Sequence, residues 1–411
     1  MPIDIEELIA RYGSPMYLYD LAVVRQRAER LKAAFDYDDL HLLYAVKANP
    51  CPPLVRTIIE AGYGIDAVSP GEVTLAQRLG LEAADILYTE NNMTEAEMHY
   101  ATGAGILINC GSLYRLERLG RSGGKRASVR INPDITDGEH AHVLTAGPLT
   151  KFGVHHSQVD ELQRIQAETD IKIVGVHMHI GSNILDVDVY LEAMQVILDV
   201  ARQLEHLEFI DFGGGLGVPY KPDDQPLDVE ALGSRASQLM RDFCKDYGRP
   251  LRMIIEPGRY LVAECGTLYT SVTAIKTNPG YDDQPPRTFV GCDTGFNHLL
   301  RPCLYDSYHP IGNATRPVAE PSVVDVVGNI CESGDVFARQ RAVPTPRVGD
   351  ILAFGCAGAY GMSMASTYNL RPLPPELVVD GDEITVVRRR RRLDELLDDW
   401  VWPEPETGDD G

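Results

Sequence analysis

The sequence has no apolar run of the ~18 residues that a membrane-spanning helix requires. Its first residues also lack the basic start and apolar core of a signal peptide, because Asp4, Glu6 and Glu7 occupy those positions. We therefore expect a cytoplasmic protein without a membrane anchor.

Positive charge and closely spaced cysteines are scarce as well. Lys and Arg number 38 against 60 Asp and Glu, so the formal net charge of −22 argues against nucleic acid or an anionic membrane as a partner. None of the eight cysteines forms a CxxC pair, which indicates free thiols instead of a disulfide framework. A hydrophobic share of 44% over 411 residues is enough for a sizeable core in two or three domains.

Short apolar segments with β-branched residues recur through the first part of the chain, and helix-like segments lie between most of them. Strands that alternate with helices predict βαβ units and a parallel sheet. Eight such strands match a (β/α)8 TIM-like barrel in number and length, with a doubly wound open sheet as the alternative. The eight segments are Leu42–Val46, Gly64–Val68, Ile86–Tyr88, Ile106–Asn109, Ser128–Asn132, Ile171–His179, Glu208–Phe212 and Met253–Glu256.

Two of the intervening helices have clear signals. Ser69 suits the N-cap of one, with Pro70 in its first turn and Glu72 as the capping-box partner. The second, Tyr190–Leu204, has apolar residues at a helical spacing of 3.6.

After Cys265 the pattern changes to strands with little helix between them. An Asp380-Gly381 hairpin signal interrupts the last of these segments. The Pro15–Tyr19 segment is one more expected strand, which could pair with this late region. We therefore expect a barrel domain of residues 22–264 and a mostly β domain, a β-barrel or sandwich, formed by residues 1–21 and 265–411. The late strands expected are Gly266–Thr277, Thr288–Asp293, Ser322–Ile330, Asp350–Phe354 and Leu377–Val387.

Several groups that could do chemistry follow the predicted barrel strands, at the mouth where barrel active sites lie. Lys47 comes directly after the first strand; partial loss of solvation there would lower its pKa and make it a nucleophile for aldehydes. Glu256 and Arg259 end the eighth strand, where Arg259 suits a phosphate or carboxylate and Glu256 a buried cationic nitrogen. Taken singly, a surface lysine and a surface ion pair explain these residues as well.

A glycine-rich loop and a histidine add to this set. Gly213, Gly214 and Gly215 follow the seventh strand, and a backbone without Cβ atoms can close on phosphate oxygens, although a tight turn explains it equally. The spacing is neither a dinucleotide fingerprint nor a Walker A sequence. His179 ends the sixth strand, where it could stack on a flat ligand, act as a base or lie in the core.

Later residues supply an acid and an anion site. Cys331 stands beside acidic residues, which disfavour the thiolate, so it suits a proton donor; a structural thiol is the alternative. Arg301 could hold a substrate carboxylate, and Tyr360 could donate its hydroxyl to a phosphate. Together with a nucleophilic lysine, a phosphate loop and a carboxylate, these are the parts that pyridoxal 5′-phosphate requires.

No metal is assigned. His177 and His179 alternate across one strand and point opposite ways, so they are poor joint ligands. The His155-His156 pair has no matching carboxylate cluster in the sequence.

Six separated motifs identify the family. With them the chain resembles the fold-type III pyridoxal-phosphate decarboxylases, the group that shares its barrel with alanine racemase. The CESGD form and a further RPCLY segment at 301–305 point to the branch that acts on diaminopimelate. The motifs are YAVKANP at 44–50, HIGSN at 179–183, GGGLGVPY at 213–220, EPGR at 256–259, CESGD at 331–335 and GAYG at 358–361.

The resemblance implies a reaction and a role for each residue. The reaction is the decarboxylation of meso-2,6-diaminopimelate to L-lysine and CO₂, with pyridoxal 5′-phosphate as cofactor. Lys47 would bond to the cofactor aldehyde and Cys331 would donate a proton to the α-carbon. In this family the residues that correspond to Cys331 and Glu332 reach into the active site of the other subunit, so the resemblance implies a homodimer. The implied cofactor-binding residues are Lys47, His179, Ser182, Gly213, Gly214, Gly215, Glu256, Gly258, Arg259 and Tyr360, and the implied substrate-binding residues are Arg259, Arg301, Tyr305, Glu332 and Tyr360.

Three other functions remain open. A decarboxylase for ornithine, arginine, lysine or carboxynorspermidine would share the barrel, but Arg301 argues against a substrate whose far end is purely cationic. An amino-acid racemase would need a tyrosine base opposite the lysine in place of Cys331 and Glu332. A catalytically inactive regulator would have little reason to keep Lys47, Glu256 and Cys331 together.

Overall fold

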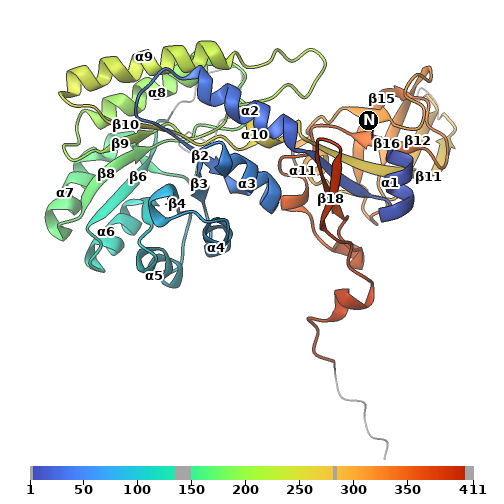
Figure 1. Ribbon diagram of the computed structural model, residues 1–411, viewed down its shortest axis with the longest axis horizontal. Helices are drawn as coiled ribbons and strands as arrows, with labels where there is room; N and C mark the ends of the chain where they lie inside the picture. The colour runs from blue at the N-terminus through green and yellow to red at the C-terminus, as the bar shows by residue number, and fades with distance from the viewer. Residues whose placement is uncertain (1–2, 135–149, 281–284, 403–411) are drawn as a thin grey trace, which may run out of the picture.

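The chain forms a closed parallel barrel joined to a mixed β-sheet region, as the computed structural model in Figure 1 shows for residues 3–134, 150–280 and 285–402. Eight strands pair in a ring, closed by the β10–β2 and β5–β6 pairings, and the short β7 (Val154–His155) extends β6. The predicted (β/α)8 barrel is therefore confirmed. Its strands are β2 (Leu40–Ala45), β3 (Gly64–Ala67), β4 (Ile86–Thr89), β5 (Leu107–Cys110), β6 (Arg126–Asn132), β8 (Lys172–His177), β9 (Phe209–Asp211) and β10 (Arg252–Ile255).

Helices cover the outside of the barrel, with apolar faces turned inward. Ser69 caps α4 as predicted, since its Oγ accepts the Glu72 N–H at 3.3 Å. The Glu72 carboxylate accepts the N–H of Val68 at 2.7 Å, so the predicted reciprocal bond goes to the residue before the cap. Asp186 caps α8, which begins earlier than its apolar spacing predicted. These helices are α2 (Leu21–Ala34), α3 (Pro52–Glu60), α4 (Pro70–Arg78), α5 (Glu95–Gly103), α6 (Leu113–Arg121), α7 (Val159–Thr169), α8 (Val187–Ala201) and α9 (Val229–Tyr247).

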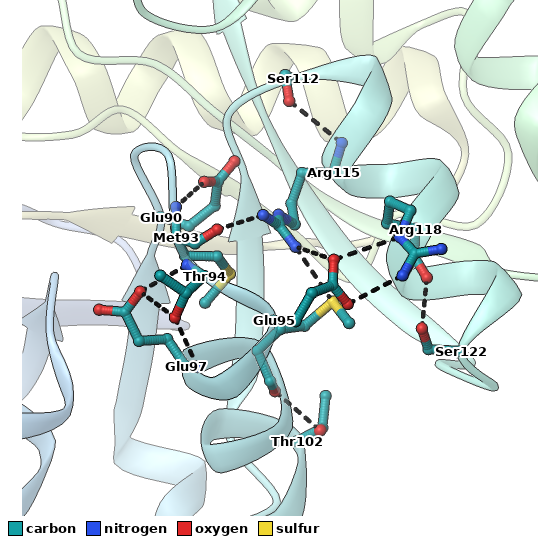
Figure 2. A network of polar contacts seen from close by, with 11 residues as sticks. Glu90, Met93, Thr94, Glu95, Glu97, Thr102, Ser112, Arg115, Arg118 and Ser122 are labelled. Carbon is teal, nitrogen blue, oxygen red and sulfur yellow. Dashed lines mark hydrogen bonds and ion pairs between the residues drawn. The ribbon is translucent and has the colours of Figure 1, made fainter.

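A buried arginine links α5 to α6 on the outer face of the barrel (Figure 2). Arg115 is buried, and its guanidinium donates to the backbone carbonyl of Met93 and lies 3.4 Å from a carboxylate oxygen of Glu95. Arg118 donates to the same carboxylate at 3.1 Å. These contacts hold α5 and α6 together.

The second region is a β-sheet built from the N-terminal and the C-terminal parts of the chain. The N-terminal strand β1 (Met16–Asp20) lies between β11, to which it is antiparallel, and β17, to which it is parallel, as expected. The predicted hairpin joins β17 to β18, with Gly381 at φ +63°. Two strands here, β13 and β15, were not predicted. The remaining strands are β11 (Gly266–Asn278), β12 (Arg287–Cys292), β13 (Ile311–Asn313), β14 (Pro321–Val327), β15 (Val336–Pro344), β16 (Ile351–Phe354), β17 (Glu376–Asp380) and β18 (Glu383–Arg388).

Short helices complete the fold, and none of the helices in the described ranges is long and apolar enough to cross a membrane. Lys47 lies in a 3-10 turn directly after β2. The short elements are α1 (Ile5–Tyr12), α10 (Arg259–Val262), α11 (Arg301–Tyr305) and the 3-10 turns Val46–Ala48, Ala83–Asp85, His156–Gln158, Met362–Met364, Tyr368–Leu370 and Asp394–Leu397.

Backbone contacts fasten the β region to the carboxyl end of the first barrel strand. The N–H of Tyr360 donates to the carbonyl of Ala48 at 2.8 Å, and the Asn49 side chain donates to the carbonyl of Gly358 at 2.8 Å. The turn that carries Lys47 therefore lies where barrel and β region meet.

Candidate active site

Lys47 faces an acidic partner from the next strand. Its Nζ lies 3.2 Å from Oδ2 of Asp66, a buried residue of β3. Burial alone would lower the lysine pKa, but Asp66, followed by Tyr360 and Glu256, raises it above the ordinary value. The predicted fall in pKa is therefore wrong, because the sequence did not reveal a carboxylate beside the ammonium.

Glu256 is a buried carboxylate with His177 and Asp211 as neighbours. Its Oε2 accepts from Nε2 of His177 at 3.0 Å. Burial would raise its pKa, but His177 and then Lys47 lower it to about 2, so Glu256 is ionised. Burial and Glu256 raise the pKa of neighbouring Asp211 well above its usual range, so that carboxyl keeps its proton. The protonated Asp211 can donate to Glu256, which lowers the Glu256 pKa further, so this pair of carboxyls carries one negative charge.

The three glycines permit a close backbone approach. A Cβ on Gly213 would lie 2.0 Å from the carbonyl oxygen of Met178, and one on Gly214 would lie 2.2 Å from that of Glu256. Gly215 has φ +95°, which disfavours any other residue. The N–H of Gly213 donates to Asp211 at 2.8 Å and that of Gly214 to His179 Nδ1 at 3.3 Å. Two of the N–H groups expected to face a phosphate therefore have protein partners here.

His179 is held as a neutral ring beside this loop. Burial, then Lys47 and Arg130, lowers its pKa well below the usual value. Arg130 is itself buried over the ring of Phe152, at 4.5 Å, and burial lowers its pKa to about 10. A neutral imidazole in this place can stack on a flat, electron-poor ring.

Two arginines converge on one tyrosine. Arg259 donates to Ser182 Oγ at 2.7 Å and to the Tyr220 hydroxyl at 2.7 Å, and its guanidinium lies 4.9 Å from the centre of the Tyr360 ring. Arg301 donates to the same Tyr220 hydroxyl at 3.1 Å. The structure thus brings together four residues that the sequence singled out from four separate motifs.

Gly258 packs the end of β10 against the Lys47 turn. A Cβ there would lie 3.2 Å from the Cβ of Ala45 and 3.3 Å from that of Ala48. Gly258 therefore packs closely against residues on either side of Lys47, and its predicted contact with the cofactor stays a prediction.

Three predicted residues lie apart from this cluster. Cys331 and Glu332 are exposed, and Tyr305 is 62% exposed. Glu332 accepts from the hydroxyl of Tyr368 at 2.6 Å, and the N–H of Cys331 donates to Asn369 at 3.2 Å. Among residues 3–134, 150–280 and 285–402, no hydrogen bond or ion pair links Cys331, Glu332 or Tyr305 to the buried cluster around Lys47.

A carboxylate does face His155, for which the sequence offered none: His155 Nε2 lies 3.3 Å from Asp134. That expectation was therefore wrong, because Asp134 follows another strand. His177 was set aside for its alternation with His179, and the structure places its ligand atom within 4.8 Å of those of Asp211 and Glu256, which come from other strands.

Sequence reasoning also missed Asp66, Arg130, Asp211 and Tyr220. The first three are charged residues in or at the end of strands that are otherwise buried on both faces. A charged side chain in such a strand must find a polar interior, which is a signal the sequence did contain.

Comparison with known proteins gives the family. Residues 21–263 match the family model for the pyridoxal binding domain of pyridoxal-dependent decarboxylases. A diaminopimelate decarboxylase of Methanothermobacter thermautotrophicus is 43% identical over 406 residues, which cover 96% of this chain and 93% of the relative. The solved structure of diaminopimelate decarboxylase from Helicobacter pylori complexed with L-lysine is 34% identical, with a TM-score of 0.86 over 96% of this chain and 98% of that one.

A lysine/ornithine decarboxylase from Vibrio vulnificus, solved with putrescine, shares the fold at 24% identity, with a TM-score of 0.77 over 92% of this chain and 97% of that one. This structure shows the shared fold alone, whereas the two relatives above, at 43% and 34% identity, are both diaminopimelate decarboxylases. The chain belongs to the diaminopimelate decarboxylase family of pyridoxal-dependent decarboxylases.

Proposed function

We propose that this chain converts meso-2,6-diaminopimelate to L-lysine and CO₂ with pyridoxal 5′-phosphate. The observation that carries the proposal is the meeting at one barrel mouth of Lys47, the ionised Glu256 and two buried arginines. An amine-reactive cofactor with an anionic group, and a substrate with a carboxylate at each end, match those charges.

The residues fit the cofactor. Pyridoxal 5′-phosphate, when bound, supplies an aldehyde that bonds to amines and a ring that withdraws electrons from the α-carbon. Lys47 would hold the aldehyde carbon, and the ionised carboxylate of Glu256 would accept the N–H of the ring nitrogen. His179 would cover one ring face, and Ser182 with the Gly213–Gly215 loop, Arg259 and Tyr360 would lie about the phosphate end.

The substrate would be selected at its far end. Arg259 and Arg301 would bind the distal carboxylate, because a planar guanidinium grips a carboxylate through two N–H groups. Tyr305 and Tyr360 would line this end, and Glu332 would hold the distal ammonium. A substrate whose far end is only cationic, such as ornithine, would place its charge against two buried cations.

We infer that the active form is a homodimer in which Cys331 and Glu332 serve the site of the other subunit. In one chain both are exposed, and apolar side chains beside them are exposed too: Leu304 by 52%, Tyr305 by 62% and Leu370 by 57%. Burying those side chains against a second copy would bring the Cys331 thiol to the α-carbon as proton donor.

In this proposal residues 22–264 form the cofactor-binding barrel. Residues 1–21 and 265–411 form the β domain that supplies Arg301, Cys331 and Tyr360.

CO₂ release tests the function. Purified protein with added cofactor should release CO₂ from meso-diaminopimelate, and far less from LL-diaminopimelate, ornithine or lysine. Release chiefly from ornithine or lysine would assign it to another decarboxylase group, and racemisation without release would make it a racemase.

Complementation tests the shared site. The Lys47→Ala and Cys331→Ala proteins should each be inactive alone. When their subunits exchange at random, half of the dimers contain one chain of each kind, and one of the two sites in such a dimer has both native residues. The mixture should therefore recover up to about a quarter of the wild-type activity. A mixture as inactive as its parts would place Cys331 in the site of its own chain.

A further inference from the structure

Tyr220 stands between the two arginines of the site. Its hydroxyl oxygen accepts from Arg259 at 2.7 Å and from Arg301 at 3.1 Å, and both guanidiniums lie within 5.6 Å of its ring centre. All three side chains are buried, with 8% or less of each exposed. One phenol oxygen is thus a shared acceptor for two buried cations that arrive from different parts of the fold.

This bonding leaves the phenol proton available. A phenol oxygen can accept two hydrogen bonds and donate one. Both acceptor positions of Tyr220 are filled by N–H groups, so its own O–H points away from both arginines. No acceptor for that proton is present among the hydrogen bonds of the described residues.

Within residues 3–134, 150–280 and 285–402, no ion pair joins Arg259 or Arg301 to a carboxylate. His309 packs edge-on against the Tyr220 ring at 5.5 Å, with Nδ1 bonded to the carbonyl of Gly355, and burial lowers its pKa to about 3, so its ring is neutral. Burial lowers the pKa of Arg301, and the neighbouring Arg259 lowers it further. The only other acceptor for these two guanidiniums within hydrogen-bond reach, in the described part of the chain, is the Ser182 hydroxyl.

We propose that Tyr220 is a substrate-binding residue: it fixes the spacing of Arg259 and Arg301 and donates its O–H to the distal carboxylate of the substrate. The proposal rests on the proposed function and deepens it. The receptor for the far end of the substrate is then two guanidiniums and one phenol, and it selects amino acids that carry a carboxylate there.

Two ligands that differ only in that carboxylate isolate the effect. L-Lysine carries it, and 1,5-diaminopentane is the same chain without it. Both can be measured as competitive inhibitors and, independently of turnover, as ligands that change the absorbance of the bound cofactor. The ratio of the two dissociation constants, for L-lysine and for 1,5-diaminopentane, does not depend on the fraction of a protein sample that is active.

The test compares Tyr220→Phe with Tyr63→Phe. Tyr63 is an equally buried tyrosine whose hydroxyl donates to the carbonyl of Ala28 at 2.7 Å, away from the site. Tyr220→Phe should weaken L-lysine binding roughly 10- to 100-fold, the range for a hydrogen bond to a charged group, and leave 1,5-diaminopentane within twofold. KM for the dicarboxylate should rise much more than kcat falls, and Tyr63→Phe should leave the ratio unchanged.

Two results would overturn the inference. Equal weakening of both ligands in Tyr220→Phe would give Tyr220 a merely structural role, and an unchanged lysine constant would remove it from substrate binding. Failure of the proposed function is a separate observation, because it would appear as absence of CO₂ release from meso-diaminopimelate in the wild-type protein.

Discussion

Replacing Glu256 by Gln removes one charge from the centre of the site with almost no change in shape. Glu256 is buried, bonded to His177 at 3.0 Å, and its pKa of about 2 lies roughly two units below that of a free glutamate. Two pKa units correspond to about 3 kcal/mol of preference for the negative charge. The negative charge kept on Glu256 would in turn stabilise a protonated ring nitrogen beside it.

Loss of that interaction should slow the reaction. A hydrogen bond between charged groups contributes about 1.5–3 kcal/mol, so kcat of Glu256→Gln should fall roughly 10- to 100-fold. The measurement is CO₂ release at saturating substrate, with visible absorbance used to confirm that the cofactor is bound. Glu264→Gln is the matched control, because Glu264 pairs with Arg27 away from the buried cluster.

A fully loaded Glu256→Gln protein with kcat within threefold of wild type would refute the reasoning. So would an equal fall in Glu264→Gln, since the effect would then be general and not tied to the ring nitrogen.

Three further predictions concern stability and packing. Arg115→Met should lower the free energy of unfolding in denaturant by about 1–3 kcal/mol, because the buried carbonyl of Met93 loses its donor. It should leave kcat unchanged, because Arg115 has no hydrogen bond to a residue assigned to the site, and a fall in kcat would contradict this. Burial lowers the pKa of His298 to about 4, so the folded protein excludes a proton that the unfolded chain binds near pH 6.5. As the pH falls from 6.5 to 4.5, His298 should therefore lower the free energy of unfolding by up to about 3 kcal/mol. In thermal melts over this pH range, the His298→Gln protein should lose that part of the acid sensitivity. Gly214→Ala should weaken cofactor binding at least tenfold in absorbance titrations, because the added Cβ would lie 2.2 Å from the carbonyl oxygen of Glu256 and displace the loop. Gly103→Ala should not weaken it, because the space around Gly103 is open.

The barrel could be predicted because its strands are buried on both faces. They therefore form short continuous apolar runs, whereas a helix places its apolar residues at a spacing of three to four. The residues at the ends of those runs follow from the same fact, since parallel strands deliver them to one mouth. Lys47 and Glu256 were found this way. Their partners Asp66 and His177 were not, because a polar residue in a buried strand indicates only polar surroundings, and closure of the ring decides which side chains of neighbouring strands meet.

The β region was harder to predict. Strand β15 (Val336–Pro344) has no clean alternation, with Phe337 and Ala338 both buried, and Arg339 and Gln340 both exposed. A register shift in its pairing with β14 accounts for that pattern. Its strand character comes from the neighbouring strand and not from its own residues.

The bonding position of the cofactor tests the account most directly. Borohydride reduction of the cofactor-loaded protein would fix pyridoxal phosphate on the lysine that holds it, and peptide mass spectrometry would identify that lysine. The label should be on Lys47 alone, and Lys47→Ala should take up none at the same cofactor concentration. A label on Lys151 or another lysine, with Lys47 unmodified, would contradict the assignment of the site.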